Sequence, residues 1–229
     1  APCPLRPDPM TQPPVNPHPG IGYREMVGLI AAIMAINALG IDSMLPALPA
    51  IGEALGVAEE NRRQWVIAIF AFGLGSTQLI YGPLADRYGR KPVMRWSLGL
   101  YVLASLSAAA AGSFAMLLVA RFIQGATSAA TRVITTSVVR DCYAGRDMAR
   151  VMSLAFMIFL GVPIFAPSIG QAILHVAPWP GIFIFLAVFA GAVLIWAQAR
   201  LPETLSPEKR RPIDPRQIAA AMREAFVDR

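Results

Sequence analysis

The chain has 229 residues, of which 55% are hydrophobic and only 15% are charged. Its mean hydropathy of +0.52 is too high for a water-soluble domain of this size, and a helix needs only about 20 apolar residues to cross a bilayer. The formal net charge of +6 is therefore interpreted as the basic loops of a membrane protein, and a nucleic-acid partner is excluded. We expect an all-α membrane protein.

The predicted elements follow in chain order. Residues 1–22 form a proline-rich tail that we expect to be disordered, and residues 23–200 contain six apolar segments that we expect to cross the membrane as helices. Residues 201–229 are polar and are predicted to begin a cytoplasmic linker, with a surface helix over 215–226. The predicted membrane segments are 23–47, 65–82, 93–111, 114–139, 151–175 and 182–199.

The distribution of basic residues predicts the orientation. Most of the 20 Lys and Arg residues fall on one side of the membrane if the N-terminus is inside. Loops that remain in the cytoplasm retain Lys and Arg. We therefore expect both termini to be cytoplasmic.

The sequence offers little for catalysis. Cys3 and Cys142 lie far apart, in the tail and in a basic loop, so we expect no disulfide framework and no metal site. The two histidines and the lack of a phosphate-binding loop favour a protein that is not an enzyme.

Polar side chains recur on one face of the fourth segment. At about 100° per residue they fall within a stripe roughly 80° wide. A charged side chain at the centre of a membrane helix costs about 2.5–3.5 kcal/mol, so we expect this stripe, together with Asn37 of the first segment, to line a water-accessible cavity. An alternative is a polar seam that only joins helices. The stripe consists of Arg121, Gln124, Ser128, Arg132 and Thr135.

Asp42 and Arg121 are predicted to form a pair that takes up and releases a proton. Their depths below the outer ends of their segments, roughly 8 Å and 10 Å, are similar, so we expect the two side chains to meet. Burial and a nearby cation have opposite effects on the proton affinity of a carboxylate, so a contact that forms and breaks can drive proton uptake and release.

Residues 82–92 lie between the second and third segments and combine turn residues with charges. Short cytoplasmic loops are often basic, but that does not explain an acidic residue between two glycines. The stretch resembles the loop that joins the second and third helices in the major facilitator superfamily. Its key positions are Gly82, Asp86, Arg87, Gly89, Arg90 and Lys91.

Other segments strengthen this resemblance. Residues 121–125 resemble the fourth-helix motif of proton-coupled members, and Asp42 with residues 45–49 resembles the end of the first helix in drug/proton antiporters. Residues 81–87 and Arg140-Asp141 are similar to the Bcr/CflA drug-efflux branch. The fifth segment only approximates the antiporter pattern, because Ala166 and Gln171 replace expected glycines. Its predicted kink residues are Pro163, Pro167 and Gly170.

The resemblance implies the N-terminal half of a twelve-helix fold, with the C-terminal half missing from this sequence. It implies that residues 82–92, with Arg140 as a local charge partner, act in the conformational switch. The implied function is proton-coupled export of small hydrophobic drugs across the bacterial inner membrane, with the lipid bilayer and protons as partners and no cofactor. Two alternatives remain: an uptake symporter of the same fold, and a six-helix binding or assembly protein without transport activity.

Overall fold

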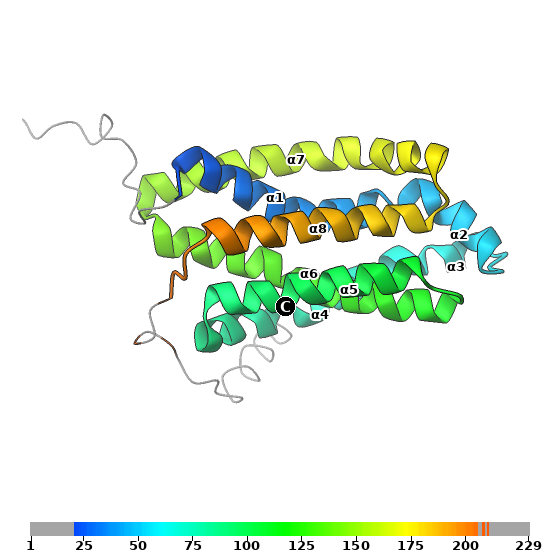
Figure 1. Ribbon diagram of the computed structural model, residues 1–229, viewed down its shortest axis with the longest axis horizontal. Coiled ribbons are helices and arrows are strands. Elements are labelled where there is room, and N and C mark those ends of the chain that lie inside the picture. Colours follow the sequence, from blue (N-terminus) through cyan, green and yellow to red (C-terminus); the bar gives the residue numbers. More distant parts are fainter. Residues whose placement is uncertain (1–20, 206–207, 209, 211–229) are drawn as a thin grey trace, which may run out of the picture.

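The computed structural model describes residues 21–205, 208 and 210. The tail over 1–20 and the predicted surface helix over 215–226 therefore lie outside the described residues. Within them the fold is entirely helical, and six long helices lie side by side (Figure 1). The elements are α1 (Tyr23–Asp42), a 3-10 turn (Leu45–Ala47), α2 (Leu48–Ala54), α3 (Glu60–Arg63), α4 (Trp65–Tyr88), α5 (Arg90–Ala109), α6 (Phe114–Cys142), α7 (Gly145–Val176) and α8 (Pro180–Arg200).

The predicted all-α bundle is confirmed, and most of its helices are apolar enough to span a bilayer. Among the described residues, five helical stretches meet this condition: α1 with α2, α3 with α4, α6, α7 and α8. The sixth long helix, α5, has 20 residues but begins with several cations and carries serines in its middle. It packs against α6 and α8 inside the bundle.

The boundary between the second and third helices differs from the prediction. Residues 82–92 do not form a loop: α4 continues through Pro83 to Tyr88, and α5 begins at Arg90. A proline is tolerated inside a membrane helix because neighbouring groups can satisfy the freed carbonyl. The whole connection is Gly89, whose φ of 100° is a conformation that glycine adopts at little cost.

The first helix is shorter than predicted. It ends at Asp42 rather than near residue 47, and the 3-10 turn and α2 follow. Pro46 and Pro49 stand at the starts of these two short elements, where a proline needs no helical hydrogen-bond partner.

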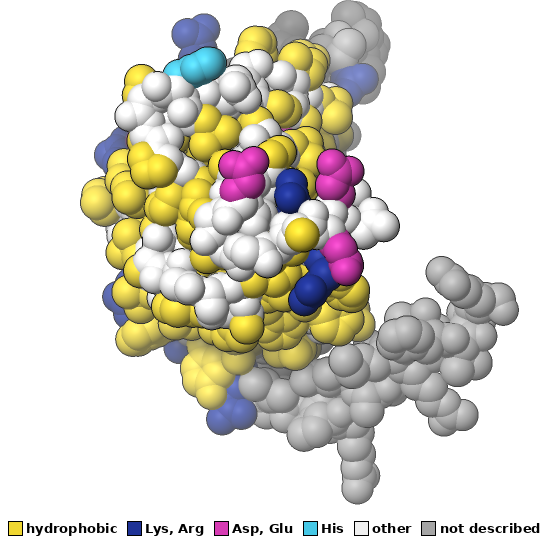
Figure 2. All heavy atoms as spheres, turned by 90° about the vertical axis from the view of Figure 1, so that its right-hand side faces the viewer, with side chains coloured by type: hydrophobic (Ala, Val, Ile, Leu, Met, Phe, Trp, Pro, Cys, Tyr) yellow, Lys and Arg dark blue, Asp and Glu magenta, His cyan; other side chains and the backbone are white. Residues whose placement is uncertain are grey.

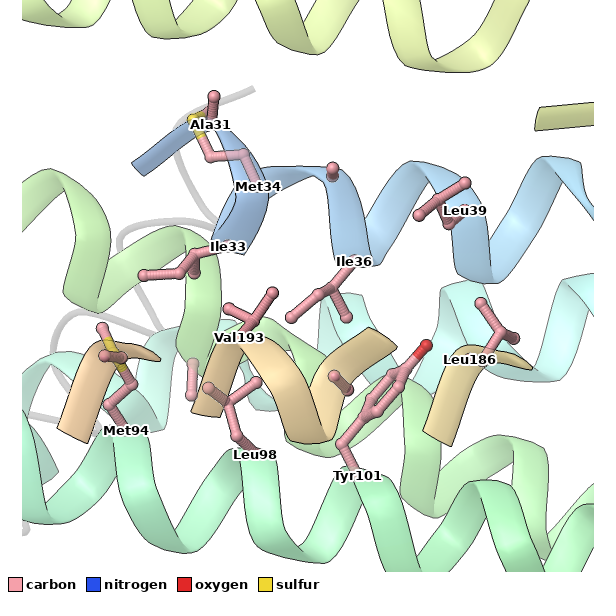
Figure 3. Close-up of a cluster of buried hydrophobic side chains, with 14 of the residues drawn as sticks. Ala31, Ile33, Met34, Ile36, Leu39, Met94, Leu98, Tyr101, Leu186 and Val193 are labelled. Atoms are coloured by element: carbon pink, nitrogen blue, oxygen red, sulfur yellow. The ribbon is translucent and has the colours of Figure 1, made fainter. Parts of the chain in front are cut away.

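The core is centred on α1. Figure 3 shows side chains of α1, α5 and α8 pointing toward one another, among them Ile36, Leu98 and Val193, with the Tyr101 hydroxyl directed toward α1. In the most apolar 18 residues of the stretch formed by α1 and α2, 72% of residues are buried, against 11% in the most apolar 18 residues of α7. The surface of α7 is therefore available to lipid or to another protein surface.

Glycines let α4 and α6 approach at backbone distance. A Cβ added at Gly125 would meet the backbone of Phe70, and one added at Gly73 would meet the carbonyl of Phe122. Thr77 Oγ1 also donates a hydrogen bond of 2.9 Å to the Ala126 carbonyl across the same contact. Small residues at such positions are typical of closely packed membrane helices.

The two ends of the bundle differ in their helix connections and in their polar side chains. One end gathers the start of α1, the α4–α5 and α6–α7 turns and the end of α8 (Figure 1). There Glu25 accepts hydrogen bonds from Arg200 at 2.6 and 2.7 Å and from Trp196 at 3.3 Å, joining α1 to α8. Figure 2 looks onto the opposite end, with α2 and α3, where hydrophobic side chains predominate around a small group of acidic and basic ones.

Candidate functional site

A cavity of about 270 Å³ lies between α1, α4, α6 and α7. Apolar side chains form most of its wall, and three polar side chains enter it: Asn37, Asp42 and Arg132. Such a wall, mainly apolar with a few polar groups, is typical of sites for small molecules. The lining residues are Met34, Asn37, Ala38, Ile41, Asp42, Leu74, Arg132, Phe156, Phe159 and Pro163.

The charged pair of the cavity is not the one predicted. Asp42, in the last turn of α1, shares the cavity with Arg132 of α6. Asp42 forms no ion pair with any cation in the described part of the chain. The expected contact between Asp42 and Arg121 is therefore absent.

Arg121 is instead fully buried in a separate polar cluster. Its guanidinium donates to the carbonyls of Gly40 and Val66, both at 2.9 Å, and to Gln124 Oε1 at 2.6 Å. The Gly40 carbonyl is one of the last four of α1, which have no partner within their own helix. The C-terminal end of a helix also attracts a cation, so the end of α1 stabilises the guanidinium without a carboxylate.

Aromatic rings complete the surroundings of Arg121. Its guanidinium carbon lies 4.4 Å from the centroid of Phe70 and 5.8 Å from that of Phe183, distances at which a cation is attracted to a ring face. Gln124 extends the cluster to α5 by donating to Ser105 Oγ at 2.7 Å. For these two α6 residues, the arrangement is a polar seam that joins α1, α4, α5 and α6.

The remaining residues of the predicted stripe also divide between the cavity and the contacts between helices. Arg132 is exposed and lines the cavity, whereas Ser128 and Thr135 are buried between helices. Ser128 donates to the Gly125 carbonyl at 2.8 Å, and Thr135 Oγ1 has no hydrogen-bond partner among the described residues. Asn37 lines the cavity and donates to Thr131 Oγ1 at 2.7 Å. One face of α6 therefore meets other helices over most of its length, because α4, α5 and α1 all pack against it.

A second polar network lies at the end of the bundle that holds the α4–α5 turn. Arg90 binds Asp86 at 2.6 Å and Asp141 at 3.2 Å. Arg140, the predicted charge partner, is exposed and makes no ion pair with a described residue. Successive helical residues point about 100° apart, so Asp141 can face α5 while its neighbour faces away.

Other predicted switch residues lie around this network. Arg87 is exposed, with its guanidinium carbon 5.3 Å from the centroid of Tyr88. Lys91 lies in the first turn of α5. Gly82 is helical, and a Cβ added there would have open space around it.

Sequence reasoning missed Glu203 in this network. Its carboxylate accepts hydrogen bonds from the backbone N–H groups of Arg90 at 2.9 Å and Lys91 at 3.2 Å. These are unpaired donors at the start of α5, where a negative charge is favoured. Thr204 donates to Asp141 at 3.2 Å, so the segment after α8 is fastened to both α5 and α6. No local pattern identifies such a cap, because it acts across more than a hundred residues of sequence.

The predicted kink residues of α7 lie in a helix that is assigned without interruption through Pro163 and Pro167. Pro163 lines the cavity. Gly170 packs against the Ser43 carbonyl just after α1, and a Cβ there would collide with it. The kink itself stays a prediction.

Comparisons with known proteins agree with this architecture. The family model described as Major Facilitator Superfamily matches residues 30–229. A multidrug resistance protein MdtL from Shewanella sp. (strain ANA-3) is 36% identical over 167 residues, which cover 73% of this chain and 42% of that protein. An uncharacterized MFS-type transporter, YdgK from Bacillus subtilis, is 34% identical over 186 residues, 80% of this chain and 46% of that protein. The chain thus spans about half the length of the curated relatives it matches.

Solved structures show the same fold at lower identity. The human organic anion transporter MFSD10 (TETRAN) superposes with a TM-score of 0.68 at 24% identity, over 87% of this chain and 53% of that one. The peptide transporter POT in complex with sulfate gives a TM-score of 0.68 at 18% identity, over 92% of this chain and 46% of that one. The family match, the relatives and the helical arrangement agree: this multi-pass membrane chain belongs to the major facilitator superfamily, and its described residues form the N-terminal six-helix half of that fold.

Proposed function

We propose that the chain is half of a transporter that exports small hydrophobic drugs across the bacterial inner membrane in exchange for protons. The observation that carries this proposal is the cavity in which Asp42 and Arg132 are the charged groups of an otherwise mainly apolar wall. The relatives that are named multidrug resistance proteins support the same substrate class.

The wall suits an apolar molecule more than a polar nutrient. Phe156 and Phe159 of α7, Leu74 of α4 and Met34 of α1 offer contact area but no hydrogen bonds. A site for a polar substrate needs more fixed donors and acceptors, so the lining favours drug export over uptake symport. We place the rest of the substrate site on the second half that the length of the relatives implies.

In this proposal Asp42 carries the proton. Its carboxylate faces the cavity without a fixed cationic partner, so a proton and the drug can compete for the same space. Arg132 is the cation that lines the same cavity, and we assign it the role of influencing Asp42 as the cavity changes shape. Arg121 acts indirectly, because it holds the Gly40 carbonyl two residues before Asp42 and so fixes the end of α1.

The distribution of charge supports an orientation of the chain in the membrane. The end of the bundle that holds the α4–α5 and α6–α7 turns carries most of the described cations, including Arg90, Arg140 and Arg150, whereas Arg62 and Arg63 lie at the other end. Because cytoplasmic loops are enriched in Lys and Arg, we assign this end to the cytoplasm.

The test is Asp42→Asn in the full-length transporter. Drug binding per folded molecule, measured across pH, should lose its pH dependence, and drug-driven proton release should stop, because the amide cannot exchange a proton. Arg132→Gln should keep the pH dependence but displace its midpoint to higher pH, because a positive charge has been removed from the cavity.

Glu59→Gln is the matched control, since Glu59 is an exposed carboxylate in the connection before α3. It should bind drug and release protons as the unaltered transporter does. Unchanged pH dependence in Asp42→Asn would reject Asp42 as the proton carrier. A purely structural role would instead reduce the yield of folded protein and leave binding per folded molecule intact.

A further inference from the structure

A second hollow, of about 450 Å³, lies between the end of α4 and the start of α5. Val93 and Ser97 of α5 form its buried floor, and Tyr88, Trp96 and Leu100 form an exposed rim. It is separate from the cavity that Asp42 and Arg132 line, because the two share no lining residue.

The groove has the depth of one membrane leaflet. Its upper limit is the turn at Gly89, where the membrane span α4 ends. Leu100 lies ten residues into α5, or roughly 15 Å from the turn at 1.5 Å per residue. That is about half of a hydrocarbon core of roughly 30 Å. The groove therefore runs from the membrane surface to near the middle of the bilayer.

Aromatic rings and cations gather at the mouth of the groove. The guanidinium carbon of Arg87 lies 5.3 Å from the centroid of Tyr88, and that of Arg95 lies 5.8 Å from the centroid of Trp96. Trp96 is 67% exposed, the highest value among the groove residues. Trp and Tyr prefer the interface between lipid headgroups and acyl chains, so the Tyr88 end of the groove lies at headgroup level. Arg95 lies about 9 Å further along α5, and its long side chain can extend back toward that level.

The two arginines at the mouth have no carboxylate partner. Arg87 and Arg95 make no ion pair within the described part of the chain, whereas their neighbour Arg90 binds two aspartates. Two positive charges thus remain available beside an apolar groove. A headgroup phosphate is the anion that a bilayer supplies at this depth, and arginine binds phosphate with good geometry.

We propose that the α4–α5 groove binds one anionic phospholipid of the leaflet at the α4–α5 turn. An acyl chain lies over Val93 and Ser97, between Tyr88 and Trp96, and the phosphate contacts Arg87 and Arg95. This site requires only that the chain lies in a bilayer, so it stands independently of the substrate or the direction of transport.

Quenching of tryptophan fluorescence by brominated lipids tests the proposal in the full-length transporter. The protein is reconstituted in vesicles that contain either a brominated phosphatidylglycerol or a brominated phosphatidylcholine. The contribution of Trp96 is the difference between the transporter and its Trp96→Phe variant. We expect Trp96 to be quenched more strongly by the anionic lipid, with a preference of about fivefold for each arginine at the mouth.

Variants of the mouth separate this site from a general attraction of lipid. Arg87→Gln with Arg95→Gln should bring the preference at Trp96 close to one. Arg62→Gln is the control, because Arg62 is an exposed cation just before α4, at the other end of the helix, and it should leave the preference at Trp96 unchanged.

Three results would overturn the proposal. Equal quenching by both lipids at Trp96 means that headgroup charge is not recognised. Little quenching by either lipid means that another part of the protein covers the groove. Loss of the preference on adding inorganic phosphate, at constant ionic strength, means that the mouth is a site for a free anion and needs no acyl chain.

Discussion

Replacement of Gly125 by alanine tests the contact between α4 and α6 most directly. A Cβ at this position would lie 2.8 Å from the carbonyl carbon of Phe70 and 3.0 Å from its Cα, and closer still to the carbonyl oxygen. All three atoms belong to the backbone of α4, so no side-chain rotation can relieve the collision. The two helices must move apart, and hydrogen bonds across the interface, such as Thr77 to the Ala126 carbonyl, must lengthen.

The magnitude follows from a comparison with Gly75→Ala. Gly75 lies in the same contacting pair of helices, but a Cβ there meets nothing within 4 Å. Both substitutions should raise the free energy of unfolding by about 0.5–1 kcal/mol, because alanine is more favourable than glycine in a helix. Only Gly125→Ala also overpacks the interface, which lowers the free energy of unfolding by about 1–3 kcal/mol. The difference between the two variants should therefore be about 1–3 kcal/mol, with Gly125→Ala the less stable.

The free energy of unfolding in mixed micelles, measured by titration with a denaturing detergent, gives this difference. Gly75→Ala should be at least as stable as the unaltered protein. Equal stability of the two alanine variants would refute the reasoning, because it would mean that α4 and α6 are not held at backbone distance. Lower stability of Gly75→Ala would show that the alanine gain does not apply in this helix.

Three further predictions concern the two polar networks. Arg121→Lys should lower the free energy of unfolding by about 1.5–3 kcal/mol, measured by the same titration, because one ammonium cannot reach both carbonyls and Gln124. If the proposed function holds, Asp141→Asn should slow drug export and leave the equilibrium drug affinity unchanged. Arg140→Gln should change neither the export rate nor the affinity. Comparable slowing by both variants would contradict the ion pairing to Arg90. Glu203→Gln should speed amide hydrogen exchange at the start of α5 by about fivefold, since a lost helix cap costs about 1 kcal/mol, and Glu208→Gln should leave that exchange unchanged.

Much of the fold could be predicted because apolar length determines it. The helices α4, α6, α7 and α8 begin or end within a few residues of the predicted segments or extend beyond them. The pattern of apolar residues does not define where a helix ends when polar and turn residues continue the helix. Residues 82–88 illustrate this, since their composition is typical of a loop but they continue α4 to Gly89.

The candidate site was predictable only in part. The angular position of a residue around its own helix does not show which neighbouring helix its side chain contacts. Asn37, Asp42 and Arg132 do line one cavity. Arg121 lies on the same stripe of α6 as Arg132, yet the end of α1 provides it with a free carbonyl at Gly40. Two of the three hydrogen-bond acceptors of Arg121 are backbone carbonyls, and the groups that Glu203 caps are backbone N–H groups. Every residue carries such groups, so residue types alone do not indicate these contacts.

The modest apolarity of α5 has a consequence for how the protein is made. During synthesis each segment that leaves the ribosome must partition between the aqueous channel and lipid, and strongly apolar segments do so alone. The helix α5 begins with Arg90, Lys91 and Arg95, and its Ser105 is hydrogen-bonded to Gln124 of α6. The hydrogen bond from Gln124 and the ion pair between Arg90 and Asp141 can form only once α6 is present, so we expect α5 to leave the insertion channel together with α6 as a hairpin.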